Sequence, residues 1–411
     1  MARDFWHGKR AKTILPEQSY SFFRPALLTL SMELDVYGCP TAVRPWGIHP
    51  SSDARRYATI RYRLLLANLL GSLLVLGLMQ LSGFSHAIAR WWSERFASET
   101  LVILSYLAAV GTFYELIFLP LNFYGSFLLE HRFGLSRMTL KQWLIREAKQ
   151  LAIGALFGAL LVEGLYALLR YASESWPLWA TIGWVTFSVV LARMFPTLLL
   201  PIFYKSAPLQ DESLAKRLLG LCQRAGIQAL GVFRLDLGVE TRKANAALAG
   251  LGKTRRVLLS DTLLEQFSAD EIEGVLAHEL GHQRFRHISK LLLINTLGSW
   301  VAFSLTALVG GLWIAPLGLR DLSDIAGFPT LALWFSLLSL LTLPLQQAIS
   351  RHFEWQADRF AVATASQPSA FASALRKLSS INLADPAPPR WVELLFYDHP
   401  PITKRIAAAE K

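Results

Sequence analysis

Six long apolar stretches constrain this chain more than any other feature of its sequence. As helices, with a rise of about 1.5 Å per residue, all six are long enough to cross the roughly 30 Å hydrocarbon core of a bilayer. A single such stretch could be a buried helix of a soluble core, but six in one chain predict a polytopic membrane helix bundle. The predicted spans are Leu64–Gly83, Leu101–Phe123, Leu151–Leu169, Leu178–Phe203, Leu291–Leu317 and Phe328–Ala348.

Composition and charge placement agree with a membrane protein. Hydrophobic residues make up 53% of the 411 residues and charged residues only 17%, against about 25% charged in soluble domains. The net charge of +11 comes from loops between spans, which fits positive-inside orientation and anionic lipid better than nucleic acid. The basic loops predict a multi-pass protein of an inner or plasma membrane, with both termini and residues 204–290 in the cytosol. No nucleic-acid partner is expected.

The spans divide the chain into five parts. Residues 1–60 are predicted to be an N-terminal cytosolic extension, since no secretory signal opens the chain, and 61–203 a four-span region. Residues 204–290 and 350–411 are predicted to be two halves of one small α+β domain, split by a two-span hairpin at 291–349. Short strands are expected at 232–236 and 256–259. Cys39 and Cys222 offer no disulfide framework.

Charged side chains also fall inside the predicted spans, at Glu115, Glu163 and Arg193. An ion in hydrocarbon is costly, so each should face protein or a water-filled space. Two interpretations stay open: structural ion pairs within the bundle, or the lining of a polar chamber.

The segment His278-Glu279-Leu280-Gly281-His282 carries the chemistry. Two histidines four residues apart lie on one face of a helix, so their rings can meet one metal ion. Glu279 is then placed to act as general base toward a metal-bound water. Ser268 and Glu271 form a capping-box pattern that begins this helix. A chance match on a surface helix is the alternative, at odds of about 1%.

Two histidines leave the ligand set of a catalytic zinc incomplete. His287 follows the second histidine too early to be the third ligand of the extended histidine motif. The best candidate is Glu354, which follows the sixth span on a helical pattern. Asp358 shares its face and could orient a ligating imidazole. A solvated acidic face is the alternative for this pair.

Several further blocks surround His-Glu-x-x-His in a fixed order. They are Glu130 to Ser136, Asn245-Ala246-Ala247-Leu248-Ala249-Gly250, Arg256 to Leu264, Phe353 to Asp358, and Asp398-His399-Pro400-Pro401 with Arg405-Ile406. Together these blocks resemble the membrane-embedded zinc CAAX prenyl endopeptidase family, type 1, in a bacterial-like form. The resemblance covers most of residues 100 to 411.

The resemblance implies a role for each matching residue. His278, His282 and Glu354 would bind one Zn²⁺ per chain, with Glu279 and His399 catalytic and Asp358 orienting a ligand. Asn245, Ala246 and Gly250 would belong to an edge strand that pairs with the substrate backbone. Arg405, with His399, would stabilise the oxyanion or contact the substrate. An ordinary turn, or a surface proline turn and basic helix, are the alternatives for these segments.

Two departures from the family pattern stand out. The family has seven spans, and this sequence supplies six. Nothing in the sequence marks a prenylated substrate.

The sequence therefore predicts a mainly α membrane bundle with a small α+β zinc metalloprotease domain. The expected activity is hydrolysis of peptide bonds in membrane-associated peptides or proteins, lipidated or not. A quality-control protease without prenyl dependence is one alternative. A zinc-binding transporter is the other, although a structural zinc site normally has four protein ligands.

Overall fold

The computed structural model describes residues 52–172, 174–250, 252 and 255–411. The expected N-terminal extension, residues 1–60, therefore lies mostly outside the described residues. Its last part belongs to α2, which begins at Ser52, because the helix continues through arginine-rich turns that precede the apolar stretch.

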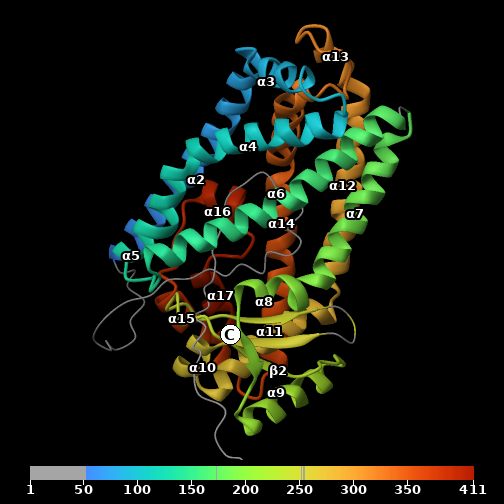
Figure 1. Ribbon diagram of the computed structural model, residues 1–411. Helices are drawn as coiled ribbons and strands as arrows, with labels where there is room; N and C mark the ends of the chain where they lie inside the picture. The colour runs from blue at the N-terminus through green and yellow to red at the C-terminus, as the bar shows by residue number, and fades with distance from the viewer. Residues whose placement is uncertain (1–51, 173, 251, 253–254) are drawn as a thin grey trace, which may run out of the picture.

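Six helical stretches in the described residues are long and apolar enough to span a membrane, which confirms the predicted number. They are Ser52–Leu81, Glu99–Arg132, Leu140–Tyr171, Trp176–Phe203, His287–Val309 and Ile325–Thr364. Figure 1 places them in the upper part of the molecule, above a small region of helices and strands. The fold is thus the membrane helix bundle with an α+β domain that the sequence predicts.

The first four spans comprise the helices α2 (Ser52–Leu81), α4 (Glu99–Phe123), α5 (Leu129–Arg132), α6 (Leu140–Tyr171), α7 (Trp176–Met194) and α8 (Leu200–Phe203), with α3 (Phe84–Ser93) as a short connection. π-helical turns, Tyr124–Leu128 and Phe195–Leu199, join α4 to α5 and α7 to α8. Each lies near a proline, Pro120 or Pro196, which cannot donate the usual helical hydrogen bond.

The last two spans form the expected hairpin. It consists of α12 (His287–Val309), α13 (Gly311–Ile314), a 3-10 turn (Ile325–Gly327) and α14 (Phe328–Thr364). α14 is one continuous helix that leaves the bundle and enters the α+β domain. The sixth span and the Glu354 segment therefore belong to one rigid element.

The α+β domain contains a four-stranded sheet in the order β1-β2-β4-β3. Its strands are β1 (Ser206–Pro208), β2 (Val232–Leu235), β3 (Ala246–Ala249) and β4 (Arg256–Ser260), and its helices are α9 (Glu212–Arg224), α10 (Asp261–Gln266), α11 (Ala269–Arg284), α15 (Pro368–Ile381), α16 (Arg390–Phe396) and α17 (Ile402–Ala409). β2 and β4 are parallel, whereas β1 and β3 are antiparallel edges. Strands β2 and β4 fall where the sequence predicts them.

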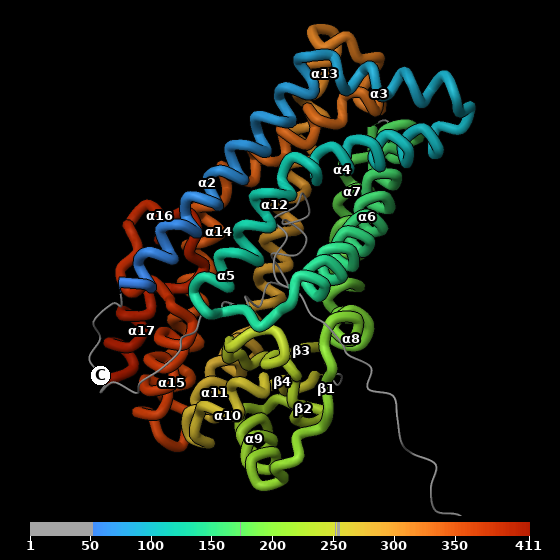
Figure 2. The backbone as a smooth tube through the Cα atoms, turned by 60° about the vertical axis from the view of Figure 1, so that its left-hand side comes forward, coloured from blue at the N-terminus to red at the C-terminus, as the bar shows by residue number. Residues whose placement is uncertain are grey.

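The core of this domain joins both halves of the sequence. Leu218, Leu259 and Leu276 from the first half and Ala361 and Phe371 from the second belong to one buried cluster. The tube in Figure 2 follows the chain from the first half, through α12 and α14, to α15, which lies beside α11, and on to α17. The two predicted halves thus share one hydrophobic core.

A cavity of about 2370 Å³ lies between the membrane helices and the α+β domain. Residues of α2, α4, α6, α7, α12 and α14 line it, together with Glu279 of α11. Glu115 lines this cavity, whereas Glu163 lies 3.7 Å from Arg170 and accepts a hydrogen bond from Thr100. Arg193 is exposed on α7. The polar-chamber interpretation thus applies to Glu115 and the ion-pair interpretation to Glu163, whereas Arg193 fits neither.

Candidate metal centre and active site

The helix α11 begins where its sequence dictates. Ser268 accepts a hydrogen bond from the backbone N–H of Glu271, whose side chain accepts one from the N–H of Ser268. This confirms the predicted capping box, which satisfies two free donors of the first turn. From that start, His278 and His282 come to lie on one face, with their Nε2 atoms 3.1 Å apart.

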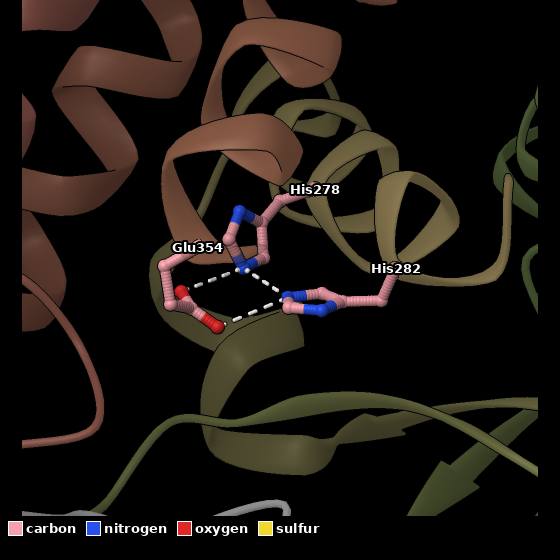
Figure 3. A group of neighbouring side chains, drawn as sticks. All are labelled: His278, His282 and Glu354. Atoms are coloured by element: carbon pink, nitrogen blue, oxygen red, sulfur yellow. Dashed lines mark hydrogen bonds and ion pairs between the residues drawn. The ribbon is translucent and has the colours of Figure 1, made fainter. Parts of the chain in front are cut away.

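A glycine lets α14 approach this face. A Cβ on Gly281 would lie 2.9 Å from the Cα of Ala357, closer than real contacts allow. One turn earlier on α14, Glu354 points at both histidines (Figure 3). Its Oε1 lies 3.1 Å from His282 Nε2, and its Oε2 lies 3.3 Å from His278 Nε2.

The donor set fits a divalent metal. One ligand atom from each of His278, His282 and Glu354 lies within 4.8 Å of the other two. Glu354 is 4% exposed, and its Oε2, although 3.3 Å from His278 Nε2 and 3.5 Å from an Arg405 nitrogen, makes no hydrogen bond in the described residues. A buried carboxylate is costly without cations beside it, so this oxygen is suited to a metal ion. Two imidazoles and one carboxylate are typical of a catalytic zinc site with an open position.

A buried carboxylate holds the first histidine. Asp358 Oδ1 lies 2.8 Å from His278 Nδ1, and Arg405 donates to both oxygens of Asp358, at 2.9 and 2.7 Å. Burial opposes a charge on His278, but the carboxylates of Glu354 and Asp358 raise its pKa to about 9. Both carboxylates thus favour the protonated ring, and a metal bound at Nε2 would compete with that proton.

The residues before α17 bring a third imidazole to the site. The Nε2 of His399 lies 3.3 Å from Glu354 Oε1, and its Nδ1 lies 2.7 Å from the Oδ1 of Asp398. Burial opposes the charge, yet the two carboxylates raise the pKa of His399 well above its ordinary value. His399 is 38% exposed and lines the cavity, so it can donate a hydrogen bond to a bound group.

The edge strand begins at the same cavity. Asn245 and Ala246 line it together with Glu279. The backbone of Asn245 is held to β4, because its N–H donates to Ser260 Oγ and its carbonyl accepts from the N–H of Ser260. Gly250, past the far end of β3, is not among the lining residues and has a φ of 101°, which favours glycine.

The predicted site residues, apart from Gly250, thus lie around one metal-binding group and one end of the cavity. Arg405 also lines the cavity, and Asp358 engages its guanidinium. Sequence reasoning assigned no role to Asp398, although its position next to His399 was a usable signal. His287, dismissed as a ligand, contacts His282.

Two family models match adjoining parts of the chain. Residues 208–411 match the model described as peptidase family M48. Residues 50–205 match the model described as CAAX prenyl protease N-terminal, five membrane helices. The chain belongs to peptidase family M48. The expected resemblance is confirmed, and this M48 chain is a membrane metalloprotease related to the CAAX prenyl proteases.

Relatives of this M48 chain match over most of their length. The uncharacterized metalloprotease YhfN of Bacillus subtilis is 27% identical over 334 residues, covering 80% of this chain and 78% of the relative. CAAX prenyl protease 1 of Saccharomyces cerevisiae is 28% identical over 336 residues, covering 76% and 72%. The crystal structure of S. mikatae Ste24p aligns with a TM-score of 0.80 and 23% identity over 95% of this chain and 96% of that chain, and so has the same fold.

Proposed function

We propose that this M48 chain is a zinc endopeptidase that cleaves extended segments of membrane-associated substrates inside its chamber. The observation that carries the proposal is the meeting of a metal-binding group, a free sheet edge and a large cavity among membrane helices at one place. We further propose one Zn²⁺ per chain, with the α+β domain and the termini on the cytoplasmic side of an inner or plasma membrane.

Zinc suits the three donors. Imidazole and carboxylate ligands are typical of catalytic zinc sites, and His278, His282 and Glu354 would hold it, with Asp358 orienting His278. When bound, zinc would supply a Lewis acid that polarises the substrate carbonyl and makes water more acidic.

The remaining steps belong to the protein's own side chains. Glu279 lines the cavity and would take the proton of the attacking water, then return it to the leaving amine. His399, held at Nδ1 by Asp398, would donate from Nε2 to the developing oxyanion. Arg405 would fix Asp358 through its two hydrogen bonds, and its guanidinium also lies 3.4 Å from His278 Nδ1 and 3.5 Å from Glu354 Oε2.

The sheet edge supports an extended substrate. Among the described residues, β3 pairs with β4 and with no second strand, so its outer edge can add a peptide strand through backbone hydrogen bonds. Asn245, Ala246 and Gly250 belong to this strand or to its ends. The relatives named CAAX prenyl protease 1 favour a lipidated substrate. The apolar walls of the cavity could hold the hydrocarbon chain of that lipid.

The first experiment compares the wild type with Glu279→Gln in detergent. Each receives a prenylated CAAX peptide and its unprenylated twin, with and without a chelator. The wild type should cleave in a chelator-sensitive way, and Glu279→Gln should lose at least a hundredfold because general-base catalysis contributes roughly 10²–10⁴-fold. Activity of Glu279→Gln above a tenth of wild type would contradict the assignment.

The two peptides separate the substrate classes. Cleavage of the prenylated peptide alone would establish CAAX-type specificity. Equal cleavage of both would move the function to quality control of membrane proteins. No cleavage by zinc-loaded wild type would contradict the proposed endopeptidase activity on these substrates.

Metal analysis tests the third ligand. Glu354→Ala removes the one carboxylate ligand of the proposed set, so this variant should lose zinc on dialysis while wild type retains about one equivalent. Glu212→Ala, which removes an 82% exposed carboxylate on α9, serves as a carboxylate control and should keep its zinc. Full occupancy in Glu354→Ala would place the third ligand elsewhere.

A further inference from the structure

His287 enters the site through an unusual turn. Helix α11 ends at Arg284 and α12 begins at His287. Between them, Arg286 has φ 55° and ψ 39°, a left-handed conformation that is uncommon for residues other than glycine. The turn reverses the chain so that the first residue of α12 packs back against the last turns of α11.

The ring of His287 is buried, with 1% exposure. It stacks on Phe353 with centroids 4.3 Å apart and planes 6° apart, and it lies 5.8 Å from the Phe285 ring. Both ring nitrogens nevertheless contact a polar atom. Nδ1 lies 3.0 Å from the Nδ1 of His282, and Nε2 lies 3.0 Å from the Oε1 of Gln356.

These contacts fix the direction of the hydrogen bonds. His282 turns its Nε2 toward His278 and Glu354, and a nitrogen that binds a cation carries no proton. The proton of His282 is then on Nδ1, which donates to Nδ1 of His287. His287 in turn carries its proton on Nε2 and donates it to Gln356.

The same direction continues one step further. The amide Nε2 of Gln356 lies 2.9 Å from the Nε2 of His352, so the amide donates outward after accepting from His287. Gln356 and His352 lie on α14, the helix that also carries Glu354. A series of hydrogen bonds therefore runs from the His282 ring on α11, through His287 on α12, to Gln356 and His352 on α14.

We propose that His287 is a positioning residue for the metal ligand His282. It accepts the Nδ1 proton of His282, which fixes the tautomer and the ring orientation that leave Nε2 free to bind the metal. Gln356 holds His287 in the accepting tautomer. Asp358 holds His278 in the same way, so the two ligating rings are fixed by different partners, one anionic and one neutral. The inference rests on the proposed zinc site.

Two substitutions separate positioning from packing. His287→Phe keeps an aromatic ring between Phe353 and Phe285 but has no acceptor for His282. His287→Asn loses the stacking ring but places an amide oxygen near the position of Nδ1. A purely structural His287 predicts that Phe is tolerated and Asn is harmful, whereas a positioning residue predicts the reverse order for zinc affinity.

The measurement is zinc affinity of the full chain in detergent, by competition with a chromophoric chelator, beside the thermal midpoint of the zinc-free protein. His287→Phe should weaken zinc binding about 10- to 100-fold and leave the zinc-free midpoint unchanged. His287→Asn should lower that midpoint yet bind zinc more tightly than His287→Phe. Gln356→Leu leaves the ring in place but removes its acceptor, so it should weaken zinc binding less than His287→Phe.

The outcomes are distinct. Wild-type affinity in both His287→Phe and Gln356→Leu would overturn the inference while leaving the zinc site intact. Zinc binding by His287→Asn that is no tighter than zinc binding by His287→Phe would also overturn the inference. If His287→Phe does not fold, Gln356→Leu alone decides, and unchanged affinity there overturns the proposal. A wild-type protein that binds no zinc would instead contradict the proposed function, and the positioning role with it.

Discussion

At the residue scale, Glu273 illustrates how a buried charge ties α11 to its surroundings. Its side chain is 1% exposed and contacts Arg217 of α9, Arg224 at 3.3 Å, and the hydroxyl of Ser366 at 2.7 Å. Burial would raise the pKa of Glu273, but the Ser366 and Arg217 hydrogen bonds lower it below its ordinary 4.5. The carboxylate therefore favours the folded state above the unfolded pKa, and this contribution is lost as the pH falls through the lower folded value.

This sign gives a prediction for acid stability. Glu273→Gln should destabilise the protein by roughly 1.5–3 kcal/mol at pH 7, because the amide loses the charge-assisted hydrogen bonds that the buried carboxylate accepts from Arg217 and Ser366. Its stability should also fall less steeply than that of wild type below pH 4.5. Thermal unfolding between pH 7 and pH 3.5 measures both, with the exposed Glu212→Gln on α9 as control. Parallel pH profiles for Glu273→Gln and wild type would contradict the argument.

At the element scale, the contact between α11 and α14 sets the ligand geometry. Gly281 has no Cβ, and this lets α11 pack closely against the backbone of Ala357 in α14. Glu354 precedes that contact by one turn, so any widening moves its carboxylate away from His278 and His282.

Gly281→Ala should therefore lose zinc as well as stability. Overpacking costs typically about 1–3 kcal/mol. The two helices must separate, because the added Cβ would clash with backbone atoms of Ala357, which cannot move aside as a side chain can. Zinc content and thermal midpoint are the two measurements. Gly298→Ala on α12, where an added Cβ meets nothing within 4 Å, is the matched control. Wild-type zinc affinity in Gly281→Ala would show that the close approach does not set the ligand distance.

At the scale of the whole molecule, the sequence predicts the membrane spans, which hydropathy determines, and the histidine pair, which the His-Glu-x-x-His motif determines. The six spans follow from hydropathy alone, but their ends do not, because α2 starts at Ser52 and α14 runs to Thr364 through polar residues. Spacing pairs His278 with His282. It could not find His287, whose contact depends on the left-handed Arg286 and on stacking against Phe353. Nor could it show that Asp358 engages Arg405, since 47 residues separate them.

Contacts between the membrane helices and the α+β domain come together just before β3. Glu130 of α5 is 3% exposed and lies 3.3 Å from the Nζ of Lys243, itself 3% exposed. Tyr57 of α2 donates to the same carboxylate at 2.6 Å. Ser136, in the loop after α5, forms a bridge with Thr241. The membrane bundle thereby fixes the segment that leads into Asn245.

Lys243→Met should consequently weaken substrate binding without weakening zinc binding. Removing one partner of a buried ion pair costs roughly 3–5 kcal/mol, and the strain falls on the entry to β3, not on α11 or α14. We expect KM for a peptide substrate to rise about tenfold, equivalent to about 1.4 kcal/mol, with zinc affinity unchanged. Glu130→Gln combined with Lys243→Met should recover part of the stability, because neither charge then remains in the buried pair. A fall in kcat and zinc content at unchanged KM would mean that this ion pair supports the metal centre, and the strand would then be positioned by β4 alone.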